Sequence, residues 1–237
     1  MSYRKIGIIG GVGPSATILY YRGIIAGYQK RKGDLHFPAI VIHSLDYGQV
    51  IEYFEKNTLE VLSEKLVQVI DGLRGSGCSF AVLACNGMHM VFDRVQERSS
   101  LPMLNLIECV LKEVKSRRVK RVGLIGTTFA MRSGLYRQPL ERSGIECLVP
   151  DEPEQDWIMK VINVDLQQTC VPHDTVVRLL KDVDALGERG AEGIILGCTD
   201  LPAAITSENS PIPLFDSTKL HVEAILDWSL GITEAIH

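Results

Sequence analysis

Short apolar stretches alternate with longer amphipathic stretches along the chain. The apolar stretches are rich in Ile, Val and Leu and are hydrophobic without a break, which is typical of parallel strands covered on both faces. They predict strands at residues 5–10, 39–43, 80–84, 103–106, 121–126, 146–149, 193–197 and 214–215. The longer stretches carry apolar residues at helical spacing and predict helices at residues 15–31, 58–74, 88–98, 107–116, 131–142, 154–169, 174–189 and 218–230. Strands that alternate with helices predict an α/β fold with mainly parallel sheets.

Several landmarks recur in the same order in the two halves of the chain, 111 to 116 residues apart. The first landmark is a strand flanked by glycines, at 7–10 and 123–126. The next two are a glycine and the cysteine eight residues after it, which are Gly77 with Cys85 and Gly190 with Cys198. The last is a segment whose second residue is proline, at 101–105 and 212–216. Recurrence at nearly constant spacing indicates two similar α/β domains. We expect residues 1–105 with a returning helix in 217–237 to form one domain, and residues 106–216 the other. We also expect a pseudo-two-fold axis between them and an active site in their shared cleft.

Two of the six cysteines, Cys85 and Cys198, occupy the same place in the two halves. Each follows an apolar strand directly and precedes a polar pair and a helical pattern. Ligands of α/β sheets bind at the carboxyl ends of strands, and a helix N-terminus there favours thiolates and anions. We interpret the other cysteines as structural, because free cysteine is usually a small buried hydrophobe; they are Cys78, Cys109, Cys147 and Cys170.

Across a pseudo-two-fold axis, the two thiols would face one bound ligand from opposite sides. Inversion of a stereocentre needs this arrangement, because a proton leaves one face and another arrives on the opposite face. A thiol with a pKa of about 8.5 is only slightly ionised at neutral pH. We therefore expect the site to lower the pKa of one thiol and to hold one thiolate and one thiol at rest.

The carbanion left by removal of an α-proton must be stabilised as an enediolate, and backbone N–H groups and short polar side chains can do this. The candidates after the two cysteines are Asn86, Gly87 and Thr199, and the loops after the first strand of each half add residues 10–13 and 127–128. The sequence has neither a lysine motif for pyridoxal phosphate nor a cluster with metal-ligand spacing. We therefore expect no cofactor and no metal.

At these residues the chain resembles the cofactor-independent aspartate/glutamate racemase family, over essentially its whole length. The motifs that carry the resemblance are Gly-Gly-Val-Gly-Pro at 10–14 with Ala16-Thr17, Ala-Cys-Asn-Gly-Met-His at 84–89 and Gly-Cys-Thr-Asp at 197–200. The resemblance implies two α/β domains with the active site between them, Cys85 and Cys198 as the paired bases, and a homodimer. It also implies contacts to an amino-acid substrate from Asn86, Gly87, Thr127, Thr199 and Asp200. In the same interpretation the loop with Gly11 and Val12 brings its N–H groups to a substrate carboxylate.

Two features resemble the aspartate racemase branch of the family. Asp200 stands where glutamate racemases of cell-wall synthesis carry histidine, and the loop after the first strand lacks their acidic residue. The chain also departs from the family, with Gly87 in place of threonine, Asp200 in place of glutamate and Val12 in place of methionine. Residues 46–49 and Gln167 stand where the family supplies basic side chains for the distal carboxylate of aspartate.

Charge and composition restrict the partners of the protein. Lys and Arg number 25 and Asp and Glu number 29, so the formal net charge is −4. This excludes the basic surface that nucleic acids and anionic membranes require. No apolar run approaches the roughly 18 residues of a membrane span, and the N-terminal residues lack the core of a signal peptide, so we expect a cytoplasmic protein.

These observations predict an amino-acid racemase that works without pyridoxal phosphate, acting on aspartate or glutamate, with Cys85 and Cys198 as opposed bases. Two alternatives stay open. One is a related cysteine-dependent isomerase or decarboxylase of a small dicarboxylic acid, and the other is a binding protein for small acids without catalytic activity. The role of His89, four residues after Cys85, also stays open between orienting that cysteine and capping or packing.

Overall fold

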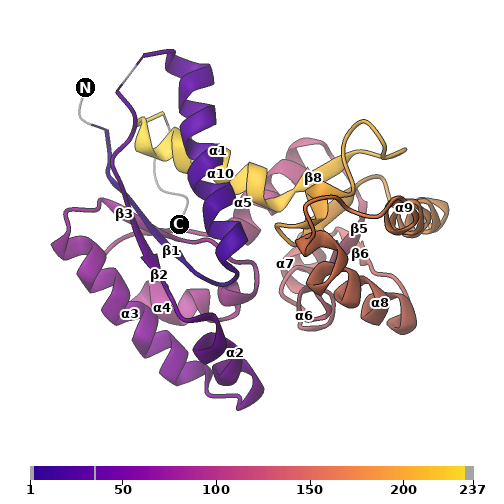
Figure 1. The fold of residues 1–237 in the computed structure, drawn as a ribbon, viewed down its shortest axis with the longest axis horizontal. Helices are drawn as coiled ribbons and strands as arrows, with labels where there is room; N and C mark the ends of the chain where they lie inside the picture. The colour runs from indigo at the N-terminus through magenta and orange to yellow at the C-terminus, as the bar shows by residue number, and fades with distance from the viewer. Residues whose placement is uncertain (1–2, 35, 233–237) are drawn as a thin grey trace. The chain divides into compact units, whose positions relative to one another are not determined.

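The computed structural model describes residues 3–34 and 36–232. The chain divides into two compact units, one made of the described residues up to Leu106 and from His221 onward, the other of Ile107–Leu220. Each unit contains one four-stranded sheet whose strands are all parallel (Figure 1). The α/β fold with two similar parallel sheets is therefore confirmed, while the domain boundaries and the pseudo-two-fold axis stay predictions. Among the described residues, no helix combines the length and the apolarity that a membrane span needs.

The first sheet has the strand order β2-β1-β3-β4, with strands β1 (Ile6–Gly10), β2 (Ile40–Ser44), β3 (Phe80–Leu83) and β4 (Met103–Leu104). Its helices are α1 (Pro14–Lys32), α2 (Tyr47–Glu55), α3 (Leu59–Gly75), the 3₁₀ helix η1 (Gly87–Val91), α4 (Phe92–Arg98) and α10 (Ser217–Ser229). One face of the sheet packs on α3 and α4, where Ile9 and Leu83 join Leu66 and Ile70 in one apolar cluster. The opposite face carries α1 and α10 (Figure 1). The rings of Phe80 in β3 and Trp228 in α10 lie 4.3 Å apart.

The second sheet repeats this topology, with the order β6-β5-β7-β8 and strands β5 (Arg121–Gly126), β6 (Glu146–Leu148), β7 (Ile194–Gly197) and β8 (Leu214–Asp216). Its helices are α5 (Leu106–Ser116), α6 (Thr128–Arg132), α7 (Arg137–Arg142), α8 (Glu152–Asn163), η2 (Asp165–Gln167), α9 (His173–Glu188) and η3 (Leu201–Ala203). Ile125 and Leu196 of the sheet pack with Ile158 of α8 and Leu179 of α9. In each unit the first strand of the half therefore lies in the middle of the sheet, next to the strand that leads to a cysteine.

All eight predicted strands are present, with ends within two residues of the prediction. The helix predictions need three corrections. Helix α2 was not predicted, and it begins where the Asp46 carboxylate accepts the Gln49 N–H at 3.2 Å. The single helix expected at 131–142 is wrong, because Gly134 has a φ of +81° and separates α6 from α7. The helices expected at 88–98 and 154–169 each divide into an α-helix and a 3₁₀ turn.

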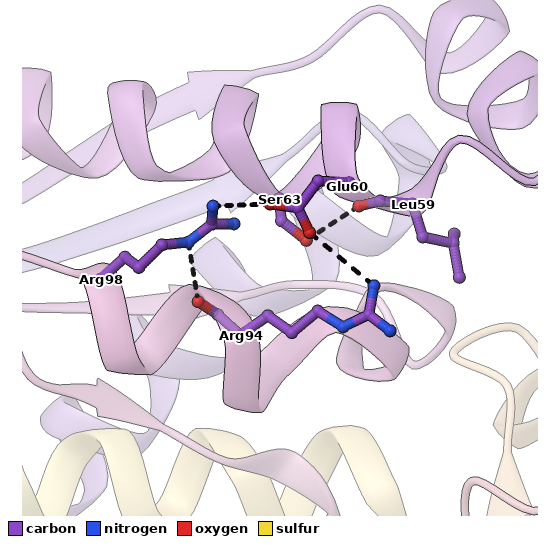
Figure 2. A network of polar contacts seen from close by, with 5 residues as sticks. All are labelled: Leu59, Glu60, Ser63, Arg94 and Arg98. Carbon is purple, nitrogen blue, oxygen red and sulfur yellow. Dashed lines mark hydrogen bonds and ion pairs between the residues drawn. The ribbon is translucent and has the colours of Figure 1, made fainter.

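The contact between α3 and α4 positions the segment that follows Cys85. On its surface, Arg98 pairs with Glu60 at 2.7 Å and Arg94 approaches Glu60 at 3.9 Å, while Ser63 donates to the Leu59 carbonyl (Figure 2). The charged side chains are about half exposed, and exposed pairs contribute about 0–1 kcal/mol. The buried apolar cluster beneath them therefore holds α4, and with it η1, against the sheet.

Helices α1 and α10 approach each other closely at glycines of α1. A Cβ at Gly27 would overlap the Cδ1 atom of Leu226, and one at Gly23 would lie 3.2 Å from a Val222 methyl group. Arg31 pairs with Asp227 at 2.6 Å at the end of this contact. Gly72 in α3, by contrast, faces open space.

We predict opposite effects for two glycine substitutions in helices. Gly72→Ala should raise the free energy of unfolding by about 0.5–1 kcal/mol, because alanine restricts the unfolded chain and meets no neighbour. Gly27→Ala gains the same helix propensity but displaces Leu226, and overpacking costs about 1–3 kcal/mol, so its net effect should be destabilising. Urea unfolding measures both, and a stabilised Gly27→Ala variant would contradict the close contact.

Candidate active site

Cys85 lies between β3 and η1, at the carboxyl end of its strand, and is partly exposed. Burial raises the pKa of its thiol above the ordinary value, and hydrogen bonds from the backbone N–H groups of Met88 and Gly87 oppose that rise. The sequence predicts a lowered pKa for one of the two thiols, and Cys85 shows the opposite because desolvation outweighs the two N–H groups. A further positive group would be needed to ionise it at neutral pH.

His89 holds the backbone of Cys85. Its Nδ1 atom lies 2.9 Å from the Cys85 carbonyl oxygen, and its Nε2 atom accepts the Leu106 N–H at 3.1 Å. A carbonyl only accepts and an amide N–H only donates, so Nδ1 carries the proton and the ring is neutral. Burial lowers the pKa of His89 to about 4, against the raising effect of its backbone contacts at Cys85 and Asn86.

Cys198 is buried directly after β7, and the carboxylate of Asp200 lies near its sulfur. The Sγ atom lies 4.0 Å from Asp200 Oδ2, and the same oxygen accepts the Gln167 amide at 3.2 Å. The Gln167 amide also donates to the Ile162 carbonyl at 2.9 Å, which fixes its position. Burial raises the pKa of Asp200 and the Gln167 hydrogen bond opposes that rise. The structure thus brings Gln167 into contact with Asp200, two residues after the second cysteine.

The other predicted site residues also follow strands. The backbone of buried Asn86 accepts the His89 N–H at 3.1 Å, and Gly87 begins η1. Thr127 follows β5 and caps α6 by accepting the Ala130 N–H at 3.1 Å, while Thr199 is half-buried beside Cys198. The structure therefore groups the predicted residues at the carboxyl ends of strands within each unit.

The loop after β1 is held by its own contacts, and its role towards a substrate stays a prediction. The Gly11 N–H donates to Thr17 Oγ1 at 2.8 Å. Gly11 has a φ of +90°, and a Cβ there would overlap the backbone of Leu45, so glycine is needed for the path of the loop. The Val12 side chain is buried in the apolar cluster of the first unit.

Two residues near Cys85 were missed by sequence reasoning. His221 of α10 places Nε2 3.2 Å from the Leu104 carbonyl, and Nδ1 lies 2.8 Å from the Tyr20 hydroxyl. Single histidines and tyrosines on helices carry no local signal of such a contact.

Among residues 3–34 and 36–232, no group of three or more His, Cys, Asp or Glu side chains is arranged to hold a metal ion.

Comparison with known proteins identifies a family model that matches most of the chain. A family model described as Asp/Glu/Hydantoin racemase matches residues 9–225. The chain is 28% identical over 221 residues to the broad specificity amino-acid racemase RacX of Bacillus subtilis, which covers 90% of this chain and 92% of that protein. An aspartate racemase homologue from Pyrococcus horikoshii has a similar structure, with a TM-score of 0.85 and 30% identity over 96% of this chain and 99% of the other. Picrophilus torridus aspartate racemase gives a TM-score of 0.69 and 25% identity, covering 95% and 94% of the two chains.

The two buried histidines predict a loss of stability in acid. Burial lowers the pKa of His221 to about 3, and that of His89 to about 4, from a reference value of 6.5. Above pH 6.5 both states are neutral, and as the pH falls towards 4 the unfolded chain binds protons that the folded chain excludes. Each histidine should then cost about 1 kcal/mol per pH unit in the free energy of unfolding.

Urea unfolding between pH 7 and pH 5 measures this slope. His221→Gln should be less stable at pH 7 and lose stability less steeply in acid. His43→Gln is the matched control, because His43 is exposed and should leave the slope unchanged. Equal slopes for all three proteins would contradict the neutral, buried state of His221.

Proposed function

Because the chain belongs to the Asp/Glu/Hydantoin racemase family, we propose that it is an amino-acid racemase that inverts Cα without a cofactor. The observation that carries the proposal is the equivalent placement of Cys85 and Cys198, each directly after a central strand of one of two sheets with the same strand order. A homodimer in the cytoplasm stays part of the prediction.

In the proposed reaction one cysteine thiolate removes the α-proton from one face of the amino acid. The electron pair of the broken C–H bond moves into the carboxylate as an enediolate, and the thiol of the other cysteine delivers a proton to the opposite face of Cα. Donors beside the cysteines stabilise the enediolate; the candidates are Asn86, Gly87, Thr127 and Thr199. The two thiols exchange protonation states in each turnover, and solvent resets them.

The surroundings of the two thiols favour Cys85 as the thiolate. The N–H groups of Met88 and Gly87 donate to its sulfur, whereas the Cys198 sulfur lies 4.0 Å from the Asp200 carboxylate. A nearby anion disfavours a second negative charge, so we expect the reaction to start from a Cys85 thiolate and a Cys198 thiol. The ammonium group of a bound amino acid supplies the positive charge that Cys85 lacks.

The substrate class is an amino acid, with aspartate or glutamate proposed from the family motifs. Asp200 and Gln167, however, bring an anionic and a neutral side chain to the Cys198 loop. A carboxylate repels a second carboxylate, so the surroundings of Asp200 and Gln167 favour a neutral or cationic substrate side chain over an anionic one. Among the relatives, RacX is described as having broad specificity, which makes a full panel of amino acids the appropriate assay.

We predict that the purified protein incorporates solvent deuterium at Cα of its substrate and erodes the optical purity of that substrate. Each L- and D-amino acid is incubated in deuterium oxide and followed by chiral chromatography and mass spectrometry. Cys85→Ala and Cys198→Ala should each lower racemisation at least about 10³-fold, because one of the two proton-transfer groups is lost. Each variant should retain exchange with one enantiomer only.

The matched control is Cys170→Ala, because Cys170 is exposed and lies in neither cysteine motif. This variant should racemise at the wild-type rate. Full racemisation by a Cys85→Ser, Cys198→Ser double variant would contradict the two-thiol mechanism. A wild-type protein that converts no amino acid in the panel would contradict the proposed activity itself.

Removal of the Asp200 charge should activate the neighbouring thiol. In Asp200→Asn we expect the pKa of Cys198 to fall by about one unit, and its alkylation by iodoacetamide at neutral pH to accelerate up to about tenfold. Peptide-resolved mass spectrometry follows each cysteine separately. Asp184→Asn makes the same charge change at an exposed position of α9 and should leave Cys198 unchanged. An unchanged alkylation rate in Asp200→Asn would rule out this electrostatic role of Asp200.

A further inference from the structure

A series of buried hydrogen bonds ends on the carbonyl of Cys85, and the mechanism above does not use it. We call it the imidazole chain and define it as Tyr20, His221 and His89. The Tyr20 hydroxyl lies 2.8 Å from His221 Nδ1, and His221 Nε2 lies 3.2 Å from the Leu104 carbonyl. Two residues further along the backbone, the Leu106 N–H donates to His89 Nε2, and His89 Nδ1 reaches Cys85.

The backbone partners fix both tautomers of the imidazole chain. The Leu104 carbonyl can only accept, so His221 carries its proton on Nε2 and accepts the Tyr20 hydroxyl on Nδ1. His89 carries its proton on Nδ1 by the same argument. At His89 the Nε2 lone pair accepts the Leu106 N–H, so a second proton on that ring would break a buried hydrogen bond.

Ring packing fixes the plane of His89 as well. The His89 ring is stacked on Phe92 with centroids 5.5 Å apart and an interplanar angle of 4°. It meets the His221 ring edge-on, with centroids 5.9 Å apart. Only 5% of the His89 surface is exposed. Both nitrogen positions and the ring plane of His89 are therefore determined by its contacts.

We propose that His89 is a positioning residue for Cys85. Its Nδ1–H holds the Cys85 carbonyl, and this sets the turn from which the Gly87 and Met88 N–H groups reach the sulfur. The importance of Cys85 rests on the proposed function, but the reactivity of its thiol can be measured without any turnover. A role in packing alone would require a buried ring but not a donor at Nδ1.

Two substitutions separate the two hydrogen bonds of His89. In His89→Asn the side-chain amide can occupy the Nδ1 position and donate to Cys85, but nothing replaces Nε2. In His89→Gln the side-chain oxygen can occupy the Nε2 position and accept the Leu106 N–H, but the Cys85 carbonyl loses its donor. Both variants remove the ring and its stacking on Phe92, so both should lose stability to a similar extent.

The readout is the pH dependence of Cys85 alkylation by iodoacetamide, resolved by peptide mass spectrometry in the full-length protein. The plateau at high pH reports access to the thiol, and the midpoint reports stabilisation of the thiolate. In His89→Gln we expect the midpoint to rise by about one pH unit, because the N–H groups are no longer held at the sulfur. In His89→Asn we expect the wild-type midpoint within measurement error.

Tyr20→Phe is the matched control, since it perturbs the far end of the imidazole chain. It should lower stability and leave the Cys85 midpoint unchanged. Equal midpoints in His89→Gln and His89→Asn, whether shifted or not, would overturn the positioning role. If the wild type racemises an amino acid, His89→Gln should also lower kcat about tenfold. If it racemises none, the proposed function fails, and the midpoints still decide the role of His89.

Discussion

The site depends on one physical constraint. The surroundings of the two thiols are largely desolvated, and desolvation disfavours the thiolate that a base requires. A parallel strand ends in the interior of each unit, so a cysteine placed directly after it is desolvated, and desolvation favours the neutral thiol. At Cys85 the opposing groups are backbone N–H dipoles held by a short turn, and that turn is held in place by His89 and by the packing of η1 and α4 on the sheet. The apolar core is therefore part of what determines the chemistry of this thiol.

The two units share a topology but give their cysteines different neighbours. Both sheets place the first strand of the half beside the strand that leads to the cysteine. The first unit then supplies N–H groups and a neutral imidazole, whereas the second supplies a carboxylate and an amide. Two units with the same strand order thus place the cysteines at equivalent positions, and in the proposed reaction the differences between their neighbours favour Cys85 as the base and Cys198 as the acid.

The strands were predictable because burial on both faces leaves an unbroken apolar run. The placement of Cys85 and Cys198 after equivalent strands was predictable because the repeat aligns them. Helix α2 carries apolar residues at helical spacing after the Asp46 cap, so its signal was present in the sequence and was overlooked. Gly134 breaks a pattern that is otherwise helical. The contacts of Gln167 with Asp200 and of His221 with the Leu104 carbonyl join positions far apart in the sequence. No local pattern marks such pairs, because tertiary packing alone brings them together.

The neutrality of His89 and His221 has a chemical consequence for the base that they support. An imidazolium beside Cys85 would lower the pKa of the thiol, but it would also weaken the thiolate as a base, since basicity falls with pKa. Removal of an α-proton, which is a very weak acid, needs a thiolate that stays strongly basic. In the described part of the chain, the backbone dipoles of Met88 and Gly87 favour the Cys85 thiolate, and burial keeps both imidazoles without a second proton. In the proposed reaction the ionising charge then arrives with the substrate, so that Cys85 becomes a base only when an amino acid is bound.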